Sequence, residues 1–210
     1  MRGHQLILFN KPYLVLSQFT GPVQPGENAE PRHTLADYIP LKEVYPAGRL
    51  DYDSEGLLLL TDSGALQARI AEPRYKLAKH YWVQVEGEPD HKALQALRTG
   101  IKLKDGLTRP AATTLLDESP PLWEREPPVT DHRHRNSCWL NISLTEGKNR
   151  QVRRMCAAVG HPVLRLVRHR IGSWALDKLQ PGEWKTVNVH LPQPKRSRTA
   201  ASRENFNKFS

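Results

Sequence analysis

The sequence has few cysteines and no long apolar run, and each of these absences excludes a class of protein. Its 210 residues include only Cys138 and Cys156, too few for a disulfide framework and without the spacing of metal ligands. We expect both to be reduced core residues. No apolar run approaches the roughly 20 residues that span a bilayer, and Met1-Arg2-Gly3-His4 leads into a strand-like segment rather than a signal-peptide core. We therefore expect a soluble, cytoplasmic protein.

Acidic residues are outnumbered by basic ones, 22 against 31, which gives a net charge of +9. Such an excess favours a polyanionic partner, and RNA, DNA and an acidic membrane surface all fit it. The length suits one core, so we expect a single catalytic domain at 1–192. The remaining residues, 193–210, hold five basic residues against one acidic residue and almost nothing apolar, which predicts a basic disordered tail.

Several short segments have the patterns of strands and helices. Apolar or alternating runs predict strands at Gln5–Phe9, Leu57–Leu60, Lys79–Gly87, Trp139–Leu144 and Trp184–Leu191. In Lys79–Gly87 the apolar residues Tyr81, Val83 and Val85 alternate with polar ones, which is typical of a strand with one buried face. Helical spacing predicts a helix with Leu66 and Ile70 on one side, capped near Ser63, and a second in Pro89–Thr99 that ends at Gly100. This scattered order favours an α+β domain.

Two stretches lack such patterns. Gly21–Arg32 is rich in Gly, Pro, Asn and Glu, and Glu118–Arg135 carries two Pro-Pro pairs among alternating charges. We expect the first to be a mobile loop and the second an exposed irregular connection.

Three carboxylates and an arginine lie between Gly48 and Gly56, directly before the apolar Leu57–Leu60. A carboxylate beside a cationic group stays ionised at neutral pH, ready to act as a nucleophile or a base. The plainer interpretation is a solvated acidic turn. Asp51, Asp53, Glu55, Gly56 and Asp62 also match positions of a calcium-binding loop, but the last position is not Glu and Pro46-Ala47-Gly48 precludes a helix before the loop. We therefore expect no metal site.

The segment Gly147–Arg170 carries seven basic residues and no acidic one. Val152, Met155, Cys156 and Val159 follow the spacing of an amphipathic helix that ends at Gly160. A solvated face would explain such a helix, but solvated helices usually mix charges of both signs, whereas surfaces that bind phosphates do not. The neighbouring His132, His134 and Cys138 fit no common zinc spacing.

Three segments together resemble the signature regions of bacterial ribosomal RNA pseudouridine synthases. They are GRLDYDSEGLLLLT at 48–61, KHYWVQVEG at 79–87 and EGKNRQVRRMCAAVGHPVLRLVRHRIG at 146–172. The resemblance runs from about Leu6 to about Trp184. It implies the pseudouridine synthase fold, a mixed and mainly antiparallel sheet with flanking helices and a central active-site cleft. Many relatives also carry a small RNA-binding domain ahead of the catalytic one, and we expect that domain to be absent here.

The resemblance also implies roles for individual residues. Asp51 takes the position of the catalytic aspartate, Tyr81 that of a tyrosine that stacks on the target base, and Arg153 that of a basic residue paired with the aspartate. Three chemical roles remain open for Asp51: attack on the base, attack on the sugar, or removal of a ribose proton. The expected RNA-binding residues are Arg49, Lys148, Arg150, Gln151, Arg154, Arg165 and Arg168.

The implied reaction detaches uracil from the ribose, rotates it and rejoins it through C5, so no cofactor or metal is expected. The expected partner is ribosomal RNA, most specifically that of the large subunit, and the expected state is a monomer. Two other functions remain open from the residues alone. They are a non-catalytic RNA-binding or ribosome-assembly protein, and a metal-dependent nuclease built on Asp51, Asp53 and Glu55.

Overall fold

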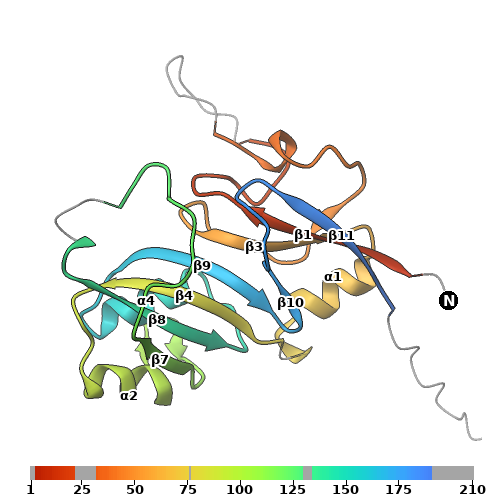
Figure 1. Cartoon of the computed structure of the whole chain (residues 1–210). Helices are drawn as coiled ribbons and strands as arrows, with labels where there is room; N and C mark the ends of the chain where they lie inside the picture. Colours follow the sequence, from red (N-terminus) through yellow and green to blue (C-terminus); the bar gives the residue numbers. More distant parts are fainter. Residues whose placement is uncertain (1–2, 22–31, 76, 130–133, 191–210) are drawn as a thin grey trace, which may run out of the picture.

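A computed structural model describes residues 3–21, 32–75, 77–129 and 134–190 of the chain. Its central feature is a nine-stranded sheet in the order β11-β1-β3-β9-β4-β8-β7, with the short β2 and β10 beside β3 and β9 (Figure 1). Among the strand pairs of the described residues, β3–β9 alone is parallel. The sheet is therefore mixed and mainly antiparallel, as expected. The predictions for Gly21–Arg32 fall almost entirely outside the described residues, as do those for His132 and the tail from Gln193.

The bounds of the elements follow from hydrogen bonding along the chain. The long strands are β1 (His4–Lys11), β3 (Glu55–Thr61), β4 (Lys79–Glu86), β7 (Ala112–Leu116), β8 (Ser137–Leu144), β9 (Val163–Ile171) and β11 (Trp184–Val189). The short ones are β2 (Tyr45–Pro46), β5 (Lys102–Leu103), β6 (Gly106–Leu107) and β10 (Trp174–Ala175). The helices are η1 (Leu35–Asp37), α1 (Gly64–Ala71), η2 (Pro73–Tyr75), α2 (His91–Thr99) and α4 (Gln151–Ala158). None of the described helices has the length and apolar character needed to cross a membrane.

Two separate hydrophobic cores cover one face of the sheet. On the β4–β8 half, Leu97 of α2 and Met155 of α4 pack on the inward residues of the strands. On the β1–β3 half, Leu35 of η1 packs on Leu58 and Leu60. The β3–β9 register sets Gly56 beside Arg168 between these two cores, on the same face. The gap between the cores leaves room for a cleft at the one parallel strand pair.

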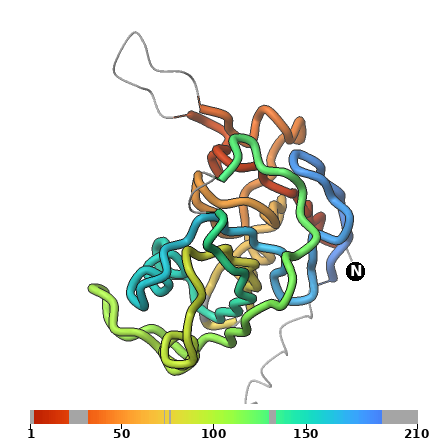
Figure 2. The backbone as a smooth tube through the Cα atoms, turned by 60° about the vertical axis from the view of Figure 1, so that its left-hand side comes forward, coloured from red at the N-terminus to blue at the C-terminus, as the bar shows by residue number. Residues whose placement is uncertain are grey.

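A third core covers the opposite face, where α1 and the segment after β10 pack on β1, β3 and β9. The connection between β7 and β8 runs along the outside of the molecule, and its Leu122 and Trp123 pack on this core (Figure 2). Residues 118–129 are therefore irregular, as predicted, whereas His134 is helical, and the prediction that the stretch is exposed is wrong at Leu122 and Trp123. Two apolar side chains between the proline pairs anchor the connection.

The predicted strands and helices are all present, with small changes at their ends. Ser63 caps α1, accepting from the amide of Leu66 at 3.3 Å, and Gly100 ends α2 with a φ of 109°. The prediction of one buried face for β4 is incomplete, because Gln84 on the other face is also buried. The connection between β7 and β8 covers this second face at Gln84, whose Nε2 lies 2.5 Å from His134 Nδ1 and donates to Ser137 Oγ at 2.9 Å. Cys138 and Cys156 are free, and burial raises the pKa of Cys156 to about 12.

Candidate active site

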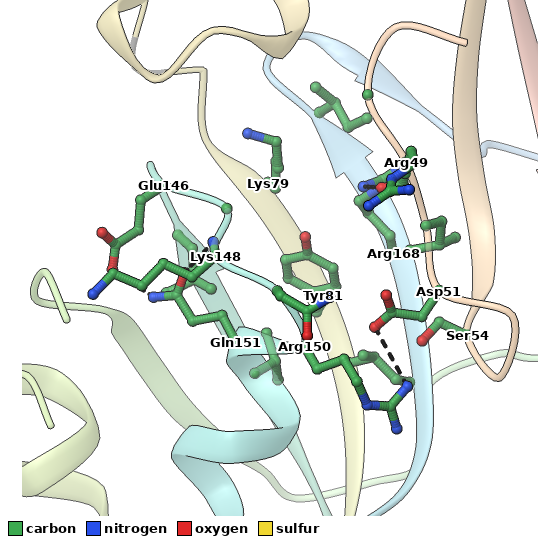
Figure 3. Close-up of a pocket in the computed structure, with 18 of the residues that line it drawn as sticks. Arg49, Asp51, Ser54, Lys79, Tyr81, Glu146, Lys148, Arg150, Gln151 and Arg168 are labelled. Carbon is green, nitrogen blue, oxygen red and sulfur yellow. Dashed lines mark hydrogen bonds and ion pairs between the residues drawn. The ribbon is translucent and has the colours of Figure 1, made fainter. Parts of the chain in front are cut away.

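A cavity of about 270 Å³ opens between the two cores (Figure 3). Its walls come from the loop before β3, from β4 and β9, from the end of α1 and from the segment that leads into α4. The polar side chains on its walls are Arg49, Asp51, Ser54, Lys79, Tyr81, Glu146, Lys148, Asn149, Arg150, Gln151 and Arg168. The three regions that sequence analysis singled out therefore meet at one cavity, although they lie far apart along the chain.

The loop that carries Asp51 is held on both sides by hydrogen bonds. The Ser17 hydroxyl accepts from the Leu50 amide at 3.1 Å and donates to the Leu50 carbonyl at 2.6 Å. Arg168, which is buried, donates from Nη1 to the Arg49 carbonyl at 3.1 Å and from Nε to the Leu57 carbonyl at 2.8 Å. These bonds fix the loop at its two ends, so the Asp51 carboxylate has a defined position.

Gly56 makes the approach of β9 to this loop possible. Its φ is +103°, and a Cβ atom there would lie 2.4 Å from the carbonyl oxygen of Arg168. No side chain fits at that distance, and the left-handed φ disfavours one independently. The glycine therefore lets β9 bring Arg168 under the loop that carries Asp51.

Arg150 is the cation that approaches Asp51. Its Nη1 lies 3.8 Å from Asp51 Oδ2, and its two Nη atoms donate to the two carboxylate oxygens of Asp53 at 2.9 and 2.8 Å. The residue is the N-cap of α4, directly before Gln151, and has a left-handed conformation with a φ of 46°. Burial pushes the pKa of Asp53 upward, but the hydrogen bonds from Arg150 and the charges of Arg153 and Arg150 outweigh it and hold that pKa below its ordinary value.

Arg153 has a different partner from the one expected. Its Nη2 donates to the backbone carbonyl of Asp53 at 2.5 Å and to Ser54 Oγ at 3.3 Å, and its Nε lies 3.4 Å from Asp53 Oδ2 without a hydrogen bond. The direct pairing of Arg153 with Asp51 is therefore wrong in this structure. Arg153 lies one helical turn beyond Arg150, so it reaches the base of the loop instead of its tip. Arg153 therefore supports the loop through its bonds to Asp53 and Ser54.

Tyr81 forms the floor of the cavity on β4. Its side chain is buried, and Figure 3 shows its ring between Lys148 on one side and Asp51 on the other. Lys79, two residues earlier on the same face, also lines the cavity, and burial followed by the charge of Arg168 lowers the pKa of its ammonium group. The structure thus brings the predicted carboxylate and the predicted aromatic ring to one cavity.

The predicted RNA-binding residues divide into three groups. Those that line the cavity are Arg49, Lys148, Arg150, Gln151 and Arg168. Arg154 lies off the cavity and forms an ion pair with Asp105 at 2.7 Å. The prediction that Arg165 faces RNA is wrong. Strand alternation turns it to the opposite face of the sheet, where it is buried and paired with Glu55 at 2.8 Å.

Sequence analysis missed two residues close to the site. Lys79 was assigned no role, although its place two residues before Tyr81 on an alternating strand predicts the same face. Lys11 is fully buried at the end of β1, and its ammonium group donates to the carbonyls of Pro12 and Val15 at 2.9 and 2.7 Å. Burial lowers the pKa of Lys11 to about 7. A lysine two residues beyond the apolar run Leu6–Phe9, at the end of the same strand, was the signal for this buried cation.

The carboxylates that resembled a calcium-binding loop do not converge. Asp51 and Asp53 share Arg150, whereas Glu55 lies on the other face of the sheet with Arg165. Within the described ranges, no three His, Cys, Asp or Glu side chains form a group that would hold a metal ion. The arrangement instead offers one partly exposed carboxylate beside a guanidinium and an aromatic ring, which suits nucleophilic or base chemistry on a planar substrate.

Comparison with known proteins gives consistent matches. A family model described as RNA pseudouridylate synthase matches residues 5–158. The chain is 54% identical to ribosomal large subunit pseudouridine synthase E of Vibrio vulnificus (strain CMCP6), over 88% of this chain and 76% of that one. It is 53% identical to the protein of the same name from Xanthomonas campestris pv. campestris, over 91% of this chain and 100% of that one. A solved structure titled "Crystal structure of pseudouridylate synthase" matches with a TM-score of 0.70 and 27% identity, over 89% of this chain and 71% of that one.

Proposed function

The chain belongs to the RNA pseudouridylate synthase family, and from that premise we propose that it converts a uridine of large-subunit ribosomal RNA to pseudouridine with Asp51 as its catalytic carboxylate. The relatives named above supply the substrate class, because both are named for the ribosomal large subunit. The observation that carries the role of Asp51 is its position on a cavity wall, 3.8 Å from the Arg150 guanidinium.

The reaction breaks the bond between C1′ of the ribose and N1 of uracil, and forms a bond between C1′ and C5. The proton on C5 is lost and one is gained at N1, so the substrate and the product have the same atoms. An ionised carboxylate serves each of the acts open to Asp51, attack on the base, attack on the sugar, or removal of a ribose proton. The guanidinium of Arg150 lies 3.8 Å from the Asp51 carboxylate, and Asp53 keeps Arg150 in place.

The target nucleotide must leave its stack to reach such a cavity, which costs a few kcal/mol of unstacking and unpairing. A cavity with an aromatic floor and cationic walls offsets part of that cost through stacking and phosphate contacts. Tyr81 supplies the ring, and Arg49, Lys148 and Lys79 supply positive charge around it. In this proposal the residues of the cavity walls bind the RNA, and Asp51 performs the chemical step.

We further propose that the enzyme works as a cytoplasmic monomer without a metal ion or other cofactor. The isomerisation needs no group from outside, since nothing is added or removed. Full pseudouridine formation in excess chelator, with RNA folded beforehand, is the expected result. A strict need for added magnesium under those conditions would contradict this proposal and favour the nuclease alternative.

Pseudouridine mapping tests the function itself. Large-subunit rRNA from cells that lack this gene should lose pseudouridine at one position, and the purified protein should restore it in a transcript of that rRNA. A non-catalytic RNA-binding or assembly protein would bind the same transcript but leave every uridine unmodified. Loss at a small-subunit position only would contradict the proposed substrate.

A further inference from the structure

One cluster beside the cavity has no role in the mechanism described above. Tyr75, in η2, has 41% of its surface exposed. The guanidinium carbon of Arg69, on α1, lies 5.6 Å from the centre of its ring, and that of Arg74 lies 4.9 Å from it. We call these three residues the arginine–tyrosine rim. A large aromatic ring beside two cations on an exposed surface is the composition found where single-stranded nucleic acid stacks.

The rim adjoins the wall of the catalytic cavity. Ala71, at the end of α1 between Arg69 and Tyr75, lines the cavity. Gln67, on the same helix, donates to the Pro46 carbonyl at 2.9 Å and so ties α1 to the segment that continues into the cavity wall. The chain then leads from the rim into β4 and Lys79, another lining residue. Ala71 and Lys79, which lie on either side of Arg74 and Tyr75 along the chain, therefore both line the cavity.

The rim has binding capacity that the described structure leaves unused. Among the described residues, the side chains of Arg69 and Lys79 make no hydrogen bond or ion pair, although the Arg69 guanidinium contacts the Tyr75 ring. Arg74 pairs with Glu72, yet 67% of its side chain stays exposed. A cluster that served only to hold η2 against α1 would be expected to bury its ring and satisfy its donors. Here 41% of the surface of Tyr75 and the exposed guanidinium donors of Arg69 remain open to a ligand.

We propose that the arginine–tyrosine rim binds an unpaired nucleotide next to the target uridine, with its base stacked at Tyr75 and its phosphate at Arg69. The inference rests on the proposed function, since it takes RNA as the substrate. It extends the recognition surface beyond the cavity to α1 and η2. An acidic protein segment would also be attracted by the two arginines, but it would gain little from a flat ring suited to stacking on a base.

The test compares Tyr75→Ala with Tyr75→Phe in the full chain, with single-stranded oligouridylate and a large-subunit rRNA transcript as probes. Stacking is worth about 1–3 kcal/mol per base, so Tyr75→Ala should weaken binding about 5- to 150-fold. Tyr75→Phe keeps the ring and should bind within about twofold of the unaltered protein. Equal affinity of Tyr75→Ala and the unaltered protein for both probes would overturn the proposal, and so would equal losses from Ala and Phe.

The charge of the rim is tested with Arg69→Gln against Lys178→Gln. Lys178 is exposed in the segment after β10, so its replacement removes the same charge elsewhere. Arg69→Gln should lower the slope of log K against log salt by about 0.7 on a single strand, and Lys178→Gln should leave it unchanged. Equal slopes for the two variants would contradict a phosphate contact at Arg69.

Polyglutamate serves as the probe for an acidic protein partner. The proposal predicts that Tyr75→Ala leaves polyglutamate binding unchanged, and a loss as large as that for RNA would overturn it. These readouts are binding constants, so they remain interpretable if the unaltered protein forms no pseudouridine, an outcome that would defeat only the proposed function. Matching thermal unfolding midpoints exclude misfolding as the cause of a loss.

Discussion

Glu55 and Arg165 form a buried ion pair at the start of β3. Its contribution to the free energy of unfolding can be measured by mutation. Glu55 begins β3 directly after the loop that carries Asp51, and 1% of its surface is exposed. Its Oε2 accepts from Arg165 Nε at 2.9 Å, and its Oε1 accepts from Arg165 Nη2 at 2.8 Å and from the Trp123 indole at 2.9 Å. Three hydrogen bonds therefore converge on one buried carboxylate.

Glu55→Gln removes the charge and keeps the shape. The amide oxygen of Gln still accepts from Trp123, but its NH₂ group faces the Arg165 guanidinium, which is left buried without an anion. Breaking one side of a buried pair in this way costs about 3–5 kcal/mol. We expect a loss of that size in the free energy of unfolding, measured by denaturant titration at neutral pH.

The matched control is Asp177→Asn, which makes the same chemical change in an exposed pair with Lys185 at 2.6 Å. Asn tolerates the positive φ of 52° at that position, so the backbone is not disturbed. An exposed pair contributes about 0–1 kcal/mol, so the control should stay near the unaltered protein. If Glu55→Gln cost no more than Asp177→Asn, the buried pair would not be what holds the start of β3. Adding Arg165→Met to Glu55→Gln should recover part of the loss, because it removes the unpaired charge.

Three further predictions concern the loop and the cavity. The pKa of Lys11 is lowered from 10.5 to about 7, so between these values the unfolded chain holds a proton that the folded chain has released. Stability should therefore rise with pH through that window by up to about 1.4 kcal/mol per pH unit, and unfolding titrations of Lys11→Met should lack this rise. Gly56→Ala should leave little folded protein by circular dichroism, since its Cβ would lie 2.4 Å from a backbone oxygen, whereas Gly64→Ala, with nothing within 4 Å, should fold normally. Tyr81→Phe should keep most of the RNA affinity, and Tyr81→Ala should lose about 1–3 kcal/mol of it in a binding titration; equal binding by the two would show that Tyr81 does not stack.

Local patterns in the sequence predicted the elements whose signals are themselves local. The alternation in Lys79–Gly87 was enough to predict β4 and to turn Tyr81 inward. The cap at Ser63 and the glycine at Gly100 fixed the ends of two helices. Each of these features depends on residues that are neighbours in the chain, so it is visible without knowledge of the fold.

Features that depend on distant partners were missed or misassigned. The strand β9 was hidden inside a basic segment, so Arg165 and Arg168 were treated as one surface although alternation puts them on opposite faces. The choice between Arg150 and Arg153 as the partner of Asp51 depends on where α4 begins relative to a loop about 100 residues earlier. The spacing of residues within Gly147–Gly160 does not show how far each arginine lies from that loop. The resemblance to the family proposed Asp51 as the catalytic position, and the fold shows that Arg150 is the cation that approaches it.

The central claim is that Asp51 performs the chemistry, and Asp51→Asn tests it most directly. Asn keeps the shape of Asp but supplies no anionic oxygen for attack or proton removal. The measurement is pseudouridine yield on large-subunit rRNA in a single turnover, with RNA affinity measured in parallel and Asp62→Asn, on an exposed residue before α1, as the control. We predict no detectable pseudouridine from Asp51→Asn, RNA affinity close to that of the unaltered protein, and full yield from Asp62→Asn. Near-normal yield from Asp51→Asn would contradict the account, and so would equal losses from both variants, because Asp62 lies beyond the far end of β3 and has no part in the proposed chemistry.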